Sequence, residues 1–185
     1  MLKFNNLFIE CKDEKNMFSQ IDLNYMKLAL NEAENCYKRG DLPVGAVLVI
    51  NGKLEGITGN SAKTDKDWTS HAESSLLHKL SWKIKQAGKD ADSKLYTTWE
   101  PCLMCTGASV IARVSEIIYA CPDPLGGMAN VNPKNLGYWN EKHWPIFREG
   151  PFSKESFELL VRYMEENRII WGEFLKKFVS EFSIH

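Results

Sequence analysis

A strand–turn–strand pattern restricts the fold more than any other feature of this sequence. The run VGAVLVI (44–50) is typical of a buried strand, Asn51-Gly52 is a hairpin turn signal, and KLEGITG (53–59) supplies the return strand. Further strands are predicted at 94–99 (KLYTTW) and 116–121 (EIIYAC). Helical patterns separate these strands. The chain is therefore expected to form an α/β domain with three layers, α/β/α, in which helices cover a central sheet.

Four helices are predicted around these strands. The first lies between Asp22, which can cap its N-terminus, and Gly40, which stops it. The second runs from about Ser70 to Gln86, and the third runs from Pro101 to about Arg113. The last helix is expected to start with Ser153 as its cap and to show an apolar face formed by Phe157, Leu160, Val161 and Met164.

The length of 185 residues suits one domain. Residues 1–20 are expected to form an N-terminal arm, and residues 21–185 a single domain with a C-terminal helical tail. The net charge of −1 gives no support for a nucleic-acid or membrane partner, and no apolar run approaches the ~18–20 residues of a membrane span. Five cysteines are an odd number, and Cys102 and Cys105 are three residues apart. This usage indicates a reduced protein with a metal or redox pair, so we expect a cytoplasmic location.

A histidine and a closely spaced cysteine pair are the candidate metal ligands. Cys102 and Cys105 fall in the first turn of the helix that Pro101 opens, on one face, where the helix N-terminus favours thiolates. The pair alone is also compatible with a redox dithiol or with half of a structural zinc site. With His71 as the third ligand, the fourth position of a tetrahedral zinc is left to water, which is typical of catalytic zinc. We expect one zinc ion per chain, and His78 is the alternative fourth ligand of a structural site.

Glu73 has two interpretations. Residues 70–73 (SHAE) fit a Ser-x-x-Glu capping box, in which Glu73 would only accept backbone hydrogen bonds. A carboxylate next to a zinc-ligand histidine can instead take a proton from water and pass it to a leaving amine. The joint pattern, His-x-Glu followed downstream by Pro-Cys-x-x-Cys, is the signature of zinc-dependent nucleobase deaminases, and it favours the catalytic role.

In their wider context these motifs resemble the cytidine and deoxycytidylate deaminase superfamily, and within it the branch of tRNA adenosine deaminases and guanine deaminases. The similar stretches are GDLPVGAVLVINGKLEGITGN (40–60), SHAES (70–74), KLYTTWEPCLMCTGASVIARVSEIIYAC (94–121) and ESFELLVRYM (155–164). They cover most of residues 25–165. The resemblance implies a cytidine-deaminase-like domain with a mixed central sheet.

The same resemblance assigns roles to individual residues. It implies that His71, Cys102 and Cys105 bind zinc and that Glu73 shuttles protons. It also implies that Asn60 hydrogen-bonds the base and that the backbone N–H of Ala72 helps to hold the ring. By its sequence context alone, Asn60 is more typical of a turn. Finally, the resemblance implies a homodimer, for which the helix at 108–114 (ASVIARV) is a candidate contact.

The sequence leaves three functions open. We favour hydrolytic deamination of a small purine base or nucleoside, such as guanine or adenosine, because residues 165–168 read EENR where a tRNA-binding member would carry a basic cluster. Trp139, Trp144, Phe147 and Trp171 are candidates to cover or stack on such a base. The alternatives are a tRNA-specific adenosine deaminase, which converts adenosine to inosine, and a zinc-stabilised binding protein without turnover. Glu73 argues against the last, since a structural metal site needs no adjacent carboxylate.

Overall fold

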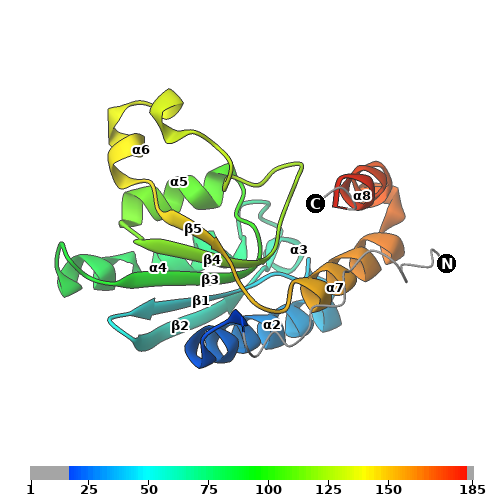
Figure 1. Ribbon diagram of the computed structural model, residues 1–185. Coiled ribbons are helices and arrows are strands. Elements are labelled where there is room, and N and C mark those ends of the chain that lie inside the picture. Colours follow the sequence, from blue (N-terminus) through cyan, green and yellow to red (C-terminus); the bar gives the residue numbers. More distant parts are fainter. Residues whose placement is uncertain (1–16, 183–185) are drawn as a thin grey trace.

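A five-stranded mixed sheet forms the centre of the protein (Figure 1). The computed structural model describes residues 17–182, so residues 1–16 of the expected N-terminal arm lie outside the described residues. In spatial order, the strands are β2 (Lys53–Gly59), β1 (Gly45–Ile50), β3 (Ser93–Trp99), β4 (Glu116–Cys121) and β5 (Ile146–Glu149). β1 pairs antiparallel with β2 and β3, whereas β3, β4 and β5 are parallel. The mixed sheet is confirmed, and β5 is a strand that the sequence did not indicate.

The β1–β2 hairpin turns at the predicted dipeptide. Asn51 and Gly52 have φ angles of 51° and 76°, and positive φ at both central residues is what a type I′ turn requires. Every residue of β1 is buried. A strand covered on both faces needs apolar side chains on both, which explains the continuous apolar run at 44–50.

Helices cover both faces of the sheet, as the three-layer prediction requires (Figure 1). α2 (Gln20–Arg39) packs against the face that carries Val47 and Tyr96. α4 (Ala72–Ala87) and α5 (Leu103–Ala112) cover the opposite face, which carries Leu48 and Leu95. α7 (Ser153–Glu166) lies beside α2 and leads into α8 (Arg168–Phe182). Among residues 17–182, no helix combines the length and the apolar character that crossing a bilayer demands.

The connections contain three short helical elements. α3 (Ala62–Asp65) lies between β2 and α4, and η1 (Pro133–Leu136) and α6 (Tyr138–His143) lie between β4 and β5. The sequence predicts no secondary structure in either connection. None of the three elements carries a buried residue, so their sequences lack the apolar periodicity that would have indicated them.

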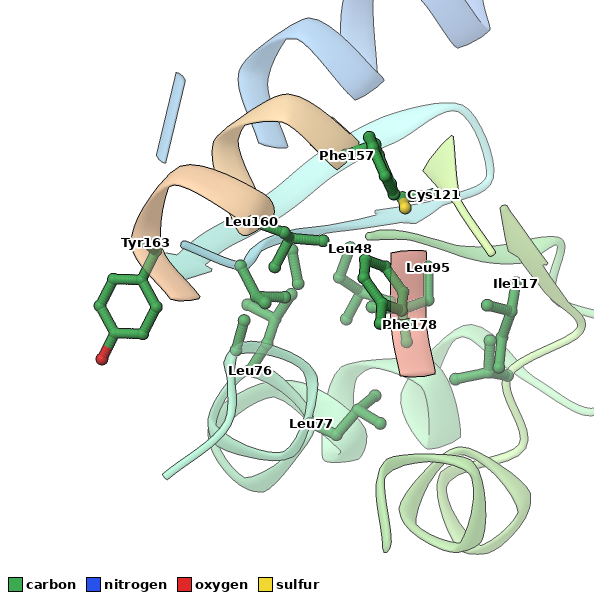
Figure 2. Packing of buried hydrophobic residues seen from close by; sticks show 14 of the residues in the cluster. Leu48, Leu76, Leu77, Leu95, Ile117, Cys121, Phe157, Leu160, Tyr163 and Phe178 are labelled. Atoms are coloured by element: carbon green, nitrogen blue, oxygen red, sulfur yellow. The ribbon is translucent and has the colours of Figure 1, made fainter. Parts of the chain in front are cut away.

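The largest cluster of buried side chains joins α4 to the two C-terminal helices (Figure 2). Leu76 and Leu77 come from α4, Phe157 and Leu160 from α7, and Phe178 from α8, and none is more than 2% exposed. Burying a side chain of this size contributes roughly 1.5–3 kcal/mol to stability. The C-terminal helix is therefore held by the same core as the sheet.

The start of α2 differs from the prediction. Ser19, rather than Asp22, caps the helix, because its Oγ accepts a hydrogen bond from the backbone N–H of Asp22. The Asp22 carboxylate is buried and accepts hydrogen bonds from the Tyr96 hydroxyl and the Arg148 guanidinium. Burial alone would raise the pKa of Asp22, but the hydrogen bonds from Arg148, Ser19 and Tyr96 outweigh it and lower the pKa. Asp22 therefore ties α2 to the sheet.

Three other helix starts are also shifted. Ser153 is the first residue of α7 and not its cap, since the cap position is taken by Phe152 in a left-handed conformation. α4 and α5 each begin two residues later than predicted, at Ala72 and Leu103. The cap positions of these two helices are held by candidate zinc ligands, as described below.

Candidate active site

The predicted zinc ligands meet at the N-termini of α4 and α5. His71 is the N-cap residue of α4 and Cys102 is that of α5, both with extended backbone, and Cys105 lies in the first turn of α5. α4 follows the connection from β2, and α5 follows β3 directly. The ends of β2 and β3 lie at the same edge of the sheet, because β1 between them is antiparallel to both. The topology thus brings the two sequence motifs together.

The ligand atoms of these three residues form one compact cluster. The Sγ atoms of Cys102 and Cys105 lie 3.7 Å and 3.6 Å from Nδ1 of His71, and all three ligand atoms lie within 4.8 Å of one another. Tetrahedral zinc, with bonds of about 2.0–2.3 Å to nitrogen and sulfur, separates its ligand atoms by about 3.3–3.8 Å. The donor set and its spacing therefore fit zinc. His78 is exposed on α4 and is not part of the cluster that the described residues form.

The environment of Cys102 favours a thiolate. A hydrogen bond from the Cys105 thiol lowers the pKa of Cys102 to about 4, against the opposing effect of burial and with further help from His71. The same hydrogen bond, together with burial, raises the pKa of the Cys105 thiol. A coordinating dication stabilises both sulfurs as thiolates, because it deprotonates the thiols that bind it.

The carboxylate of Glu73 is buried beside this cluster, with only 3% of the residue exposed. Its Oε1 accepts a hydrogen bond of 3.0 Å from Thr97 Oγ1, and its Oε2 accepts one of 3.5 Å from the Cys105 thiol. Burial raises the pKa of Glu73. The side chain thus points into the site, where it can exchange a proton with a bound molecule.

The capping-box interpretation of Glu73 is wrong. The N-cap residue of α4 is His71, and its side chain makes no capping hydrogen bond. Ser70, which would have been the cap, donates its hydroxyl to Asp67 instead. Residues 70–73 match the capping pattern in letters, but the helix begins one residue too late for it.

The two predicted substrate contacts lie next to the cluster. Asn60 follows β2 and is 2% exposed, and a backbone hydrogen bond from Ser61 to Ser70 draws it toward His71. Its Oδ1 accepts a hydrogen bond from the backbone N–H of Ala62, so it is also the turn residue that its context indicated. Ala72 is fully buried, and its N–H belongs to the first turn of α4, where amides have no partner within the helix.

Sequence reasoning missed the residues that hold the Asn60 loop. The carboxylate of Asp41 is fully buried and accepts hydrogen bonds from the backbone N–H groups of Lys63 and Thr64, from the Thr64 hydroxyl and from Arg39 Nε. Arg39 also donates to the carbonyl oxygen of Asn60 at 2.7 Å. No short motif marks this set, because its members come from α2, the loop after it and α3. Asp41 and Arg39 keep the Asn60 loop in place.

Three of the four aromatic residues considered as a cover for the base lie far from the cluster. Trp139 stacks against the guanidinium of Arg113, 4.4 Å from the ring centroid, at the C-terminal end of α5 and so opposite to Cys102. Trp144 and Phe147 contact each other at the start of β5. Ile146, between them, is in register with Glu116, the first residue of β4. That end of the sheet is the one away from the candidate zinc ligands.

Trp171 is the exception, because it lies on α8, whose aromatic side chains contact Trp99 beside the site. Trp171 contacts Phe174 edge-on, and both Phe174 and Phe178 contact the indole of Trp99 edge-on, with ring centroids 6.1 Å and 5.7 Å away. Trp99 ends β3, three residues before Cys102. The C-terminal helix therefore packs on the segment that carries two of the three candidate ligands.

A comparison with known protein families supports this arrangement. The family model of the cytidine and deoxycytidylate deaminase zinc-binding region matches residues 19–121, which is more than half of the chain and includes all three candidate ligands and Glu73. The chain belongs to this family. It is therefore a zinc-dependent deaminase, and its three-layer fold is the cytidine-deaminase-like fold that the sequence predicted.

Individual relatives of this deaminase point to one branch of the family. The tRNA-specific adenosine deaminase of Agrobacterium fabrum is 32% identical over 146 residues, which is 79% of this chain and 95% of the relative. A solved structure described as a tRNA:A34 deaminase is 33% identical, with a TM-score of 0.65, and the match covers 75% of this chain and 99% of that chain. The guanine deaminase of Nitrosomonas europaea shares the fold, with 20% identity and a TM-score of 0.57 over 75% of this chain and 82% of that chain.

Proposed function

We propose that this deaminase converts adenosine to inosine in tRNA. The observation that carries the proposal is the reach of the similarity, since 32% identity extends over 95% of the Agrobacterium fabrum tRNA-specific adenosine deaminase. The solved tRNA:A34 deaminase supports it, with a match over 99% of that chain. This reverses the preference for a free base or nucleoside that the acidic residues 165–166 had favoured in the sequence.

For the metal, we propose His71, Cys102 and Cys105 as the three protein ligands. They fit zinc in donor type and in spacing, as shown above. Zinc bound there supplies Lewis acidity, which makes water a nucleophile at neutral pH. The chain's own task is then to orient the base and to move protons.

For proton transfer, we propose Glu73 as the general base and acid. Thr97 holds Oε1, so Oε2 is the oxygen that lies toward the zinc ligands. In hydrolytic deamination of adenosine, the water oxygen bonds to C6, the bond from C6 to the exocyclic nitrogen breaks, and ammonia leaves. Glu73 takes a proton from the water and delivers it to the departing nitrogen, because neutral ammonia leaves far more easily than an amide anion.

For base recognition, we propose Asn60 and the backbone N–H of Ala72. The Nδ2 group of Asn60 donates to no residue among those the structure describes, which leaves it for a purine nitrogen acceptor. The Ala72 N–H is one of the first amides of α4 and needs an acceptor from outside the helix. Both groups belong to residues near His71: Ala72 follows it in the chain, and the hydrogen bond from Ser61 to Ser70 draws Asn60 toward it.

A free purine base or nucleoside is the second candidate substrate. One observation favours it: the last turn of α7 carries Glu165 and Glu166 and no basic residue, and carboxylates repel phosphates. This chemistry is also compatible with the same zinc site and the same Glu73. Substrate size, and not mechanism, separates the two candidates.

One panel of substrates tests the proposal. Purified protein is incubated with tRNA that carries adenosine in the anticodon wobble position, with the same tRNA carrying guanosine there, and with free guanine, adenine, cytosine and their nucleosides. Ammonia release and inosine formation are then measured. We expect turnover of the adenosine-containing tRNA alone. Phosphate contacts release counterions, so its apparent affinity should fall steeply between 50 and 200 mM salt, roughly 10³–10⁵-fold for 6–10 contacts.

Other outcomes of this panel point elsewhere. Turnover of a free purine that barely responds to salt contradicts the tRNA proposal and supports the second candidate. If the protein carries zinc but converts no substrate in the panel, the result supports the third function that the sequence leaves open, a zinc-stabilised binding protein without turnover.

We also propose that the deaminase is a homodimer joined through its α4–α5 face. A groove of about 1540 Å³ runs between α4, α5 and α6. Large apolar side chains are exposed along it, notably Trp82 on α4 and Ile111 on α5, which are 67% and 71% exposed. Exposed apolar patches of this kind mark contact surfaces. A second copy of the chain would cover them, and Ile111 belongs to the candidate contact at residues 108–114.

Replacing Ile111 by glutamate is expected to convert the dimer to a monomer, because a carboxylate would be buried without a partner at the interface. Light scattering coupled to size-exclusion chromatography measures the mass of both proteins. Glu158→Ala, at an exposed position of α7 remote from the groove, should remain dimeric. A wild-type protein that is monomeric at micromolar concentration would contradict the proposal.

For the compartment, we propose the cytoplasm. The four cysteines that the structure describes, Cys36, Cys102, Cys105 and Cys121, are all free thiols. Free thiols and a thiolate-rich metal site are typical of a reducing environment.

A further inference from the structure

A second buried carboxylate lies next to the site, and neither the motif nor the reaction accounts for it. Glu100 separates Trp99, the last residue of β3, from Pro101, and it is only 7% exposed. It contacts none of the zinc ligands through a hydrogen bond among the described residues. Its carboxylate is directed instead at the loop that follows β4.

Two backbone amides of that loop converge on Glu100. Oε2 accepts the N–H of Asp123 and Oε1 accepts the N–H of Ala129, each at 2.8 Å. A third hydrogen bond, from the N–H of Glu100 to the carbonyl of Cys121, continues the pairing of β3 with β4 to this point. Glu100 therefore clamps both ends of the segment 123–129.

Gly127 is built around the same carboxylate. A Cβ atom at Gly127 would overlap the carboxyl group of Glu100. The loop is further closed by hydrogen bonds from Gly127 to Asp123 and from Leu125 to the Asp123 carboxylate. The close approach explains why this position needs a residue without a side chain.

The clamped loop borders the site. It leaves the C-terminal end of β4, which lies beside the end of β3 where Cys102 starts α5. In sheets of this kind, ligands bind at the carboxyl ends of the parallel strands.

We propose that Glu100 is a positioning residue for substrate binding: by holding the N–H groups of Asp123 and Ala129, it fixes the loop 123–129 as one wall of the substrate site. The inference rests on the site assigned under Proposed function. Because Glu100 makes no hydrogen bond to the candidate ligands or to Glu73 among the described residues, its loss is expected to act on the shape of the site and to leave the reacting groups in place.

Two variants disrupt these contacts, one by changing the Glu100 carboxylate and the other by changing Gly127 in the loop. In Glu100→Gln, an NH2 group faces one of the two backbone N–H donors, so one end of the loop is released. In Gly127→Ala, the added methyl group displaces the carboxylate. Gly107→Ala on α5 is the matched control, because a Cβ there has no atom within 4 Å. Each variant is assayed as full-length protein, with the substrate that the wild type converts in the panel above.

The expected result is a rise in KM of roughly 10–100-fold in both clamp variants, with zinc content unchanged and kcat less affected, because misplacing a binding wall costs affinity before chemistry. Amide hydrogen exchange of residues 123–129 should also accelerate. Gly107→Ala should match the wild type in KM, zinc content and exchange.

Three outcomes would overturn the inference. The first is an unchanged KM in either folded clamp variant, even where its melting temperature falls, because Glu100 would then serve stability alone. The second is loss of zinc in Glu100→Gln, which would place Glu100 with the metal ligands. The third is unchanged hydrogen exchange of the loop. The KM of each clamp variant is compared with that of the wild type, so this inference can fail while the Glu73 and cysteine variants behave as expected. If tRNA is not the substrate, the same comparison is made with the free base or nucleoside that the wild type converts.

Discussion

Glu73→Ala is expected to lower turnover by ~10²–10⁴-fold while zinc and the fold are retained, since proton transfer by a placed side chain contributes about that much. The effect should fall on kcat, because in the proposed mechanism Glu73 serves both the attacking water and the leaving amine. Stability should change little. Thr97 loses an acceptor, but its hydroxyl is also within hydrogen-bonding distance of the carbonyl of Trp99, so no buried donor is left without a partner.

The measurement compares rate, zinc content and melting temperature on the same sample. Glu73→Gln is the sharper variant, because it keeps the shape of the side chain and removes only the exchangeable proton site. Glu158→Ala, at an exposed position of α7, controls for the loss of one carboxylate and should be fully active. A Glu73→Gln protein with turnover within a few-fold of wild type would show that the proton travels by another route.

Cys102→Ser and Cys105→Ser are each expected to reduce zinc from about one ion per chain to nearly none, because a site with three protein ligands has no spare one. Serine cannot replace the thiolate, since a hydroxyl group does not ionise near neutral pH. Activity should be lost together with zinc. Metal analysis of dialysed protein, with circular dichroism to confirm folding, measures both effects.

Cys36→Ser is the matched control for these variants. Cys36 is buried on α2 and donates to the carbonyl of Val44, a hydrogen bond that a serine hydroxyl can also make. It is not part of the ligand cluster, so zinc should stay bound. Full zinc occupancy in both Cys102→Ser and Cys105→Ser would show that the metal is held elsewhere.

Much of the central fold was predictable because its signals are local. The hairpin at Asn51-Gly52 and the buried run of β1 follow from turn chemistry and from apolar content, which neighbouring residues determine. β5 was missed because it has four residues, two of them exposed, and its pairing partner β4 is far away in the chain. The cap of α2 was misplaced because Ser19 and Asp22 are both good capping residues. The Arg148–Tyr96 environment that buries Asp22 cannot be seen from α2 alone.

The candidate site likewise has features that the sequence predicts and features that it does not. The candidate zinc ligands and Glu73 could be proposed from the sequence because their spacing along the chain carries the chemistry: Cys102 and Cys105 share the start of one helix, and Glu73 stands two residues after His71. The wrong capping-box alternative shows the limit of spacing, since the helix start decides whether Ser70 or His71 is the cap. Trp139 was expected to cover the base, but it lies at the C-terminal end of α5, away from Cys102. Nothing near Trp139 in the sequence indicates at which end of α5 it lies.

By itself, the sequence determined the chemistry of this deaminase: two thiols, an imidazole and a carboxylate at spacings that suit one metal ion and one proton transfer. Only the tertiary structure decided how these groups are oriented. Thr97 on β3 aims the carboxylate of Glu73, Asp41 and Arg39 hold the Asn60 loop, and Glu100 clamps the loop 123–129. The physical reason is that each of these hydrogen bonds joins residues 20 or more positions apart. Such partners are chosen by the packing of the sheet and helices, whereas ligand spacing within one helical turn is set by the chain itself.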